Sequence, residues 1–355
     1  MKTLRPILML ASFLIVTANA AAQTTPAPPA APTPSSTPAS KPKAKPVVKK
    51  PATPAATPSA TPAAPTATVV PAPAPDDPNI DLVYGAYQRG FYKTTFDLAT
   101  KRAQENSDPK AMTMLGELYA NALGVKRDDA KAAAWYRRAA DGGDREGMFE
   151  LAMLRLAGRG GPTDREEAAK LLASSAKLGN PKAAYNLALL YLDGQTLPQD
   201  LRRAAELLRL AADAGNPEAQ YALATFYKEG TGVPKDVEKA VRLLQAASLA
   251  DNVDAEVEYA IALFNGTGTP KNEPAAVALL RKAARQNNPI AQNRLARVLA
   301  SGQGTPVDRV EALKWHLIAK TAGKGDPALD EALANLSPED RAKAENAVRK
   351  WLGAK

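Results

Sequence analysis

Small and bulky residues alternate along this chain with a period of 36 residues. In each copy a small residue is followed by a bulky residue four positions later, a second small residue at five, and a mostly apolar residue at eight. Positions 0, 4, 5 and 8 lie on one face of an α-helix, so the pattern predicts a helix over residues 111–119 and over each counterpart. The first small positions are Ala111, Gly147, Ala183, Ala219, Ala255 and Ala291.

A second helix is predicted in every copy. Ala132 is followed by the bulky pair Trp135-Tyr136 and the small pair Ala139-Ala140. The same small residue and bulky pair recur at Ala168, Ala204, Ala240, Ala276 and Ala312, and a small pair follows in all of these copies except the last. Small residues opposite large ones let helices approach closely and interdigitate. We call the two helices of each copy the A helix and the B helix.

The segments between the A and B helices carry turn and capping residues. Glycine pairs such as Gly158 and Gly160 predict a left-handed helix end followed by a second sharp turn. An acidic or amide residue then recurs at one position and is predicted to cap the B helix: Asp128, Asp164, Asp200, Asp236, Asn272 and Asp308. Glu167 and Glu311, three residues after two of these caps, predict capping boxes.

A helix of about 12 residues is marginal in water, so the copies are expected to stack into one cooperative array. The pattern resembles the Sel1-like repeat, a relative of the tetratricopeptide repeat, in bacterial secreted or periplasmic proteins. The first copy carries the resemblance best, with Ala111, Leu115-Gly116, Tyr119, Gly124-Val125, Asp128, Lys131-Ala132, Trp135-Tyr136, Ala139-Ala140 and Gly143. The resemblance implies an all-α fold, a right-handed α/α superhelical solenoid of helix-turn-helix repeats.

Five segments are expected along the chain. Residues 1–20 resemble a signal peptide, and residues 21–76 form a linker rich in Pro, Ala, Thr and Lys that is too polar to fold. Residues 77–106 are expected to form a capping hairpin, residues 107–326 the six repeats, and residues 327–355 a helical cap that includes a helix starting near Ser337-Pro338.

The first 20 residues point to export. Lys2 and Arg5 precede the apolar run from Ile7 to Val16, and Ala18-Asn19-Ala20 forms a small-x-small cleavage site. The apolar run is short for a transmembrane helix, although an uncleaved tether stays open as an alternative. A periplasmic location is therefore expected.

The basic composition belongs mainly to the N-terminal part. Seven of the nine net positive charges fall within residues 1–75, five of them lysines of the linker, and no acidic residue precedes Asp76. The repeats are close to neutral, which argues against nucleic-acid binding. The linker lysines are a candidate contact to anionic peptidoglycan. The sequence has no cysteine and thus no disulfide.

No catalytic, cofactor-binding or metal-binding set is recognised. His316 is the single histidine and occupies the position of Tyr136, so it is expected to be a packing residue. One histidine and no cysteine leave no basis for a catalytic triad or a His/Cys metal site. Glu256 and Glu258 are expected on a solvated helix face.

A strip on the A helices is the candidate partner-binding site. In repeats of this type the A helix lines the concave surface, and two neighbouring positions of it carry aromatic and aliphatic residues in the central repeats. Such a strip suits an extended peptide or an amphipathic helix. Its residues are Phe149, Met153, Tyr185, Leu189, Tyr221 and Thr225.

These features predict a non-enzymatic scaffold or adaptor in the periplasm. The resemblance implies a protein partner, such as a membrane sensor or another envelope protein, in envelope homeostasis or in regulation of the type that acts on exopolysaccharide pathways. Two alternatives stay open: a protein that binds peptidoglycan or polysaccharide, and a hydrolase of the cell wall or of β-lactams.

Overall fold

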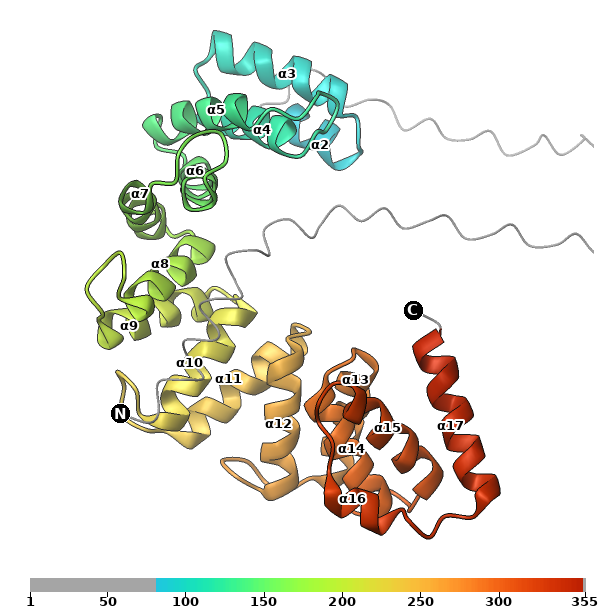
Figure 1. The fold of residues 1–355 in the computed structure, drawn as a ribbon. Coiled ribbons are helices and arrows are strands. Elements are labelled where there is room, and N and C mark those ends of the chain that lie inside the picture. Colours follow the sequence, from blue (N-terminus) through green and yellow to red (C-terminus); the bar gives the residue numbers. More distant parts are fainter. Residues whose placement is uncertain (1–80, 354–355) are drawn as a thin grey trace, which may run out of the picture. The chain divides into compact units, whose positions relative to one another are not determined.

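The structure, a computed structural model, describes residues 81–353 (Figure 1). The predicted signal peptide, the whole predicted linker and residues 77–80 of the predicted capping hairpin lie outside the described residues. No helix in the described part is both long enough and apolar enough to cross a membrane. The secondary structure of residues 81–353 is α-helical throughout, and the predicted all-α solenoid class is confirmed.

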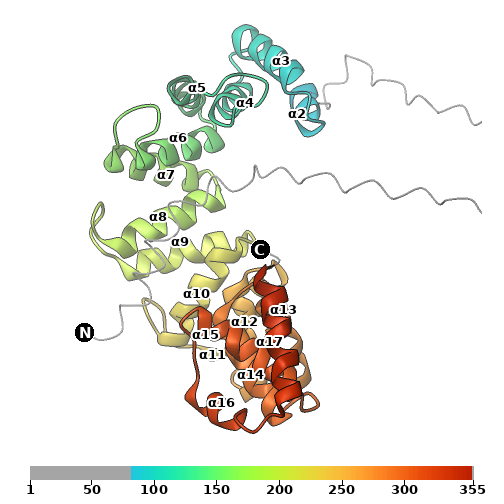
Figure 2. The same cartoon turned by 45° about the vertical axis from the view of Figure 1, so that its right-hand side comes forward.

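The helices follow the predicted two-helix period. Six A helices alternate with six B helices, and two further helices lie at each end of the array (Figures 1 and 2). The A helices are α4 (Pro109–Ala120), α6 (Arg145–Ala157), α8 (Pro181–Asp193), α10 (Pro217–Glu229), α12 (Val253–Asn265) and α14 (Pro289–Ser301). The B helices are α5 (Asp129–Asp141), α7 (Arg165–Lys177), α9 (Leu201–Asp213), α11 (Val237–Leu249), α13 (Glu273–Arg285) and α15 (Arg309–Thr321).

Each helix packs on its neighbours along the chain, and buried hydrophobic clusters follow one another along the array. Every A helix contacts the B helix that follows it, and every B helix contacts the next A helix. The predicted small positions of both helices are buried, as at Ala183 and Ala204, and Leu151 and Leu172 are fully buried as well. Burial of a leucine contributes roughly 1.5–3 kcal/mol, so the stack stabilises helices that would be marginal alone.

The predicted caps of the B helices are confirmed. The side chain of Asp164 accepts a hydrogen bond from the backbone N–H of Glu167 at 2.8 Å, and the other five cap residues accept equivalent bonds. The A helices are capped in the same way by residues that sequence reasoning missed. These are Asp108, Asp144, Asn180, Asn216, Asn252 and Asn288.

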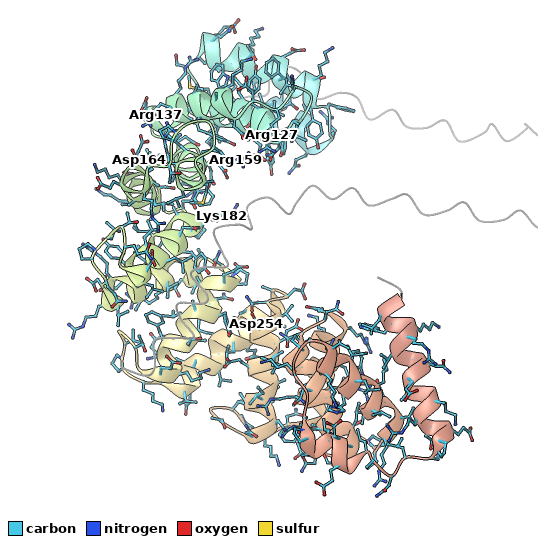
Figure 3. All side chains as sticks on the ribbon, viewed as in Figure 1. Arg127, Arg137, Arg159, Asp164, Lys182 and Asp254 are labelled. Carbon is cyan, nitrogen blue, oxygen red and sulfur yellow. The ribbon has the colours of Figure 1, made fainter. Side chains whose placement is uncertain are left out.

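The predicted capping boxes are wrong in their second half. A capping-box glutamate would accept a bond from the backbone N–H of its own cap residue, but the N–H of Asp164 donates to the carbonyl of Arg155 instead. The carboxylate of Glu167 is bonded by Arg137 and Arg155 (Figure 3 labels Arg137 and Asp164). Glu311 is likewise bonded by Arg281 of the preceding B helix, at 2.8 and 2.9 Å. Both glutamates therefore join neighbouring repeats.

The paired glycines have two different roles. Gly158 ends α6 in the left-handed conformation with φ 64°, as predicted. Gly160 also has positive φ, and a Cβ on it would lie 2.2 Å from the carbonyl oxygen of Asp129 in the preceding repeat. Gly160 is therefore required by the close approach of this loop to α5 as well as by the turn.

The ends of the array carry the predicted additional helices. At the N-terminal end α2 (Leu82–Gln88) and α3 (Tyr92–Glu105) are joined by a turn at Gly90, and α3 packs on α4. At the other end lie α16 (Pro327–Ala332) and α17 (Pro338–Gly353), and the hydroxyl of Ser337 accepts from the N–H of Asp340 at 3.1 Å. Ala344 is buried in the core against α15.

Candidate partner-binding surface

The six residues of the predicted strip lie on three successive A helices. Phe149 and Met153 come from α6, and the other four come from α8 and α10. The side chains of Phe149, Tyr185 and Leu189 are 5–7% exposed and belong to the core, whereas Met153, Tyr221 and Thr225 are half-buried. The structure thus brings the strip together on one row of helices and leaves three of its residues accessible. The assignment of the strip to partner binding stays a prediction.

A set of A-helix positions that overlaps the strip at Met153, Leu189 and Thr225 faces solvent more fully. Counted from the small residue at the start of each copy, these are positions −1, 3, 6 and 10. Because an α-helix turns by about 100° per residue, side chains at these four positions lie on the same side of the helix. None of these residues on α4 to α12 is a fully buried core residue except Leu189 and Ala222. We call this set of positions the A-face.

The A-face is acidic from α4 to α12 and basic on α14. Its cations up to α12 are Lys110 and Lys182. On α14 the same positions carry Arg294 and Arg297 and no acid. The acidic residues up to α12 are Glu117, Glu146, Glu150, Asp193, Glu218, Glu229, Asp254 and Glu258. The near-neutral balance of the repeats therefore conceals a strong separation of charge, which a count by helical position would have revealed.

One acidic group lies where α4 and α6 meet. The hydroxyl of Tyr87 donates to Glu117 at 2.8 Å, and Glu117 faces Glu150. Burial, and then the negative charge of Glu117, raise the pKa of Glu150 to about 7, and Glu146 acts in the same direction. Lys182 and Arg159 oppose this shift without forming an ion pair to Glu150 within the described residues. Negative charge at this group is therefore incompletely neutralised.

A second acidic group lies on α10 and α12. The ammonium of Lys228 bonds Glu258 at 2.7 Å. Burial and then the charge of Glu258, which accepts a hydrogen bond from the phenol, raise the pKa of Tyr221 well above its ordinary value. Asp254 contributes to the same shift, and Figure 3 labels Asp254 on α12 and Lys182 on α8.

Tyr185 differs from its counterpart Tyr221 one repeat later. Its side chain is 5% exposed, and its hydroxyl has no hydrogen-bond partner among the described residues. Ala222 occupies the position on α10 that Glu258 occupies on α12, so no carboxylate meets the hydroxyl there. Burial, and then the charge of nearby Glu218, raise the pKa of the Tyr185 phenol.

Other charged residues join repeats away from the A-face. Asp129 at the start of α5 is bonded by Arg159 of the next repeat at 2.8 Å and by Arg127 at 3.2 Å (Figure 3). The hydrogen bond from Arg159 is the main cause that lowers the pKa of Asp129 to about 2, and the bond from Arg127 adds to it. These contacts fix the loop after α6 against α5.

The expectation for Glu256 is wrong. Its side chain is fully buried, and its carboxylate lies 2.5 Å from the ammonium of Lys282, which also bonds Asp251 at 2.6 Å. Met112, Ala184 and Gln292, which are buried, occupy the same position in other repeats, so the pattern of the repeats predicts a buried side chain here. His316 is buried as expected, with Nε2 at 2.8 Å from Asp330.

Chemical sites are not evident elsewhere in residues 81–353. No group of three or more His, Cys, Asp or Glu side chains there is arranged to hold a metal ion. A cleft of about 590 Å³ lies between the loop before α15 and the segment before α17, with Val307, Arg309 and Asp340 in its lining. Its lining carries both signs of charge, and Arg281 within it is already bonded to Glu311. The cleft therefore favours no ligand class.

The repeats match a known family over more than half of the chain. The Sel1 repeat family model matches six consecutive segments, residues 109–144, 145–180, 181–216, 217–252, 253–288 and 289–324. The chain belongs to the Sel1 repeat family, whose members are typically non-catalytic scaffolds for protein–protein interaction. A search of curated proteins finds no match.

Two solved structures show the same fold. A Sel1 repeat protein from Oxalobacter formigenes is 27% identical, with a TM-score of 0.60 over 68% of this chain and 98% of that one. The protein c5321, a protective antigen present in uropathogenic Escherichia coli strains, is 27% identical with a TM-score of 0.54 over 74% of this chain. This chain spans 64% of c5321, just under two thirds of its length.

Proposed function

We propose that this protein is a periplasmic scaffold that binds a protein partner through its row of A helices and supports cell-envelope homeostasis or envelope signalling. The observation that carries the proposal is the A-face itself. It presents half-buried apolar side chains, Met153 and Ile261 among them, beside incompletely neutralised carboxylates. A surface that combines apolar anchors with charge suits a protein ligand.

The periplasmic location is supported by the first 20 residues alone. A basic start, a short apolar run and the Ala18-Asn19-Ala20 site form the pattern of a secretory signal. Fractionation of the native host, followed by the intact mass of the periplasmic species, tests this part. We expect the mass of a chain that begins at Ala21. A cytoplasmic protein that retains Met1 would contradict the periplasmic location.

Capture from the envelope fraction tests partner binding. Met153→Ser and Tyr221→Ala together remove accessible parts of the strip without disturbing Tyr185, which the core contains. We expect this variant to recover much less of a partner that the wild type recovers reproducibly. Leu210→Ala with Leu249→Ala is the matched control, since both leucines are exposed on B helices. Equal loss in both variants, or no partner with the wild type, would count against the proposal.

Peptidoglycan binding is the second candidate. It rests on the five lysines between residues 41 and 50, without any acidic residue nearby. A pull-down on purified sacculi that compares the full chain with a variant lacking residues 24–75 tests it. Retention of the full chain with loss of the deletion variant is expected if the lysines bind, and unchanged retention would exclude this role for the linker.

A further inference from the structure

The charge of the A-face goes beyond what a scaffold requires and restricts the partner. We infer that the A-face from α4 to α12 binds a cationic, lysine- or arginine-bearing extended segment of a protein partner. The inference rests on the proposed function, because it names the chemistry of the partner that the A helices would hold.

Charge complementarity is the first argument. Glu150 and Glu218 of the A-face form no ion pair within residues 81–353. Three other A-face acids are compensated, because Lys228 bonds Glu258, Arg165 bonds Asp193 and Arg145 lies 3.6 Å from Glu146. A cationic side chain placed beside Glu150 would relieve repulsion that the free protein retains, whereas an anionic polymer would increase it.

The unsatisfied hydroxyl of Tyr185 is the second argument. It is a polar group in a side chain that is 95% buried, and it lies close to Glu218 at the middle of the acidic row. An unpaired buried polar group is unfavourable, so a donor from a ligand that opens this position and reaches the hydroxyl would stabilise the bound state. Tyrosine and phenylalanine rings also attract cations, and Lys182 already lies 5.9 Å from the centre of the Phe149 ring.

Spacing favours an extended segment. Packed helices lie about 8–10 Å apart, and three residues of an extended chain span about 10 Å. The contact of α4 with α6, and the bond of Lys228 on α10 to Glu258 on α12, show that successive helices of this row come within side-chain reach. A cation at every third residue of an extended segment would therefore meet acids on successive A helices.

Two labelled peptides and two matched variants test the inference on the full chain. The probes are a 14-residue peptide of lysine, alanine and leucine, and the same peptide with glutamate at each lysine. The first variant combines Glu150→Gln, Glu218→Gln and Asp254→Asn on the A-face. The control combines Glu166→Gln, Glu206→Gln and Glu238→Gln, three exposed acids on B helices, and changes net charge by the same amount.

We expect the lysine peptide to bind at least tenfold more tightly than the glutamate peptide. We expect the A-face variant to lose roughly tenfold in affinity, because each exposed ion pair contributes up to about 1 kcal/mol and 1.4 kcal/mol is tenfold. The control variant should bind as the wild type does, and circular dichroism should show the same helix content in all three proteins.

Four results would overturn the inference: no binding of the lysine peptide, equal binding of the two peptides, equal loss in the control variant, or salt-sensitive self-association. In the last case a second copy would be the occupant, with Arg294 of its α14 as the cation, since Arg297 already pairs with Asp326. If a partner is captured through Met153 and Tyr221 while the lysine peptide shows no preference, the scaffold stands and only this inference falls.

Discussion

Tyr136 of α5 lies directly against Gly116 of α4. A Cβ on Gly116 would be 2.5 Å from a carbon of the Tyr136 ring, so the glycine and the large ring in this repeat depend on each other. The next four repeats have alanine at the position of Gly116 and leucine at that of Tyr136, for example Ala152 and Leu172. Gly116 is therefore required by its neighbour across the helix pair and not by its backbone.

Gly116→Ala should destabilise the protein by about 2 kcal/mol through overpacking, even though alanine is the usual residue here. Tyr136→Leu alone should cost a similar amount because it leaves a cavity. The double variant should cost clearly less than the two effects added, since it recreates the pair found in the next repeat. Urea unfolding of the four proteins measures this coupling, and strict additivity would contradict the proposed contact.

Tyr185 and Tyr221 occupy equivalent positions, so the effect of removing the hydroxyl on stability can be compared between them. Tyr221→Phe should cost about 1 kcal/mol because it removes the bond to Glu258. Tyr185→Phe should be neutral or slightly stabilising, since its hydroxyl is buried without a partner. Chemical unfolding of both variants gives the answer, and a larger loss for Tyr185→Phe would show that this hydroxyl has a partner in solution.

Glu150 should make the protein less stable as pH rises. Its pKa is raised to about 7 in the folded state and is about 4.3 in an unfolded chain, so between these values the folded state binds more protons. Stability from this group is therefore present below about pH 4 and is lost by about pH 7. After allowance for its partial exposure, Glu150→Gln should stabilise the protein by about 1–2 kcal/mol at pH 8 and have little effect at pH 4.

Unfolding of Glu150→Gln at both pH values checks this sign, with exposed Glu166→Gln as the control. An equal effect of Glu150→Gln at pH 4 and pH 8 would show that the carboxylate is solvated. Stabilisation at pH 4 alone would reverse the proposed electrostatics.

Glu256 and Lys282 should behave as a coupled pair. Lys282→Ala leaves a fully buried carboxylate with reduced compensation and should cost about 2–3 kcal/mol. Glu256→Gln should be within about 1 kcal/mol of the wild type, because Gln220 and Gln292 fill the same position and donate to carbonyls of the preceding B helix at 3.2 Å. Lys282→Ala should then cost little in the Glu256→Gln background, and an unchanged cost would disprove the coupling.

Much of the fold could be predicted because each structural position of the repeat occurs six times in the sequence. The period, the B-helix caps and the left-handed glycines each follow from a residue type with one local role, as at Asp164 and Gly158. The capping boxes failed because Glu167 has a competing partner, Arg137, that is distant in the sequence. A local pattern cannot show such a contact, although an arginine recurs 30 residues before Glu311 as well.

The candidate surface was predictable only in part. The spacing places Phe149, Tyr185 and Tyr221 on one side of the A helices, but a helical position does not show how closely the next helix approaches. That approach buries Tyr185 and leaves Tyr221 half-buried. The acidic A-face is formed by individual carboxylates on five helices. It becomes visible when the charges of the repeats are compared at the same helical position.

Site-specific photo-crosslinking in intact cells tests the central claim most directly. A benzophenone amino acid at Met153 or Thr225 on the A helices, and at Leu210 or Leu249 on the B helices as controls, is activated in cells that carry the full chain. The A-helix positions should yield a discrete crosslink to one protein, identified by mass spectrometry, and the B-helix positions should not. Crosslinks to that partner from Leu210 and Leu249 alone would contradict partner binding by the A helices.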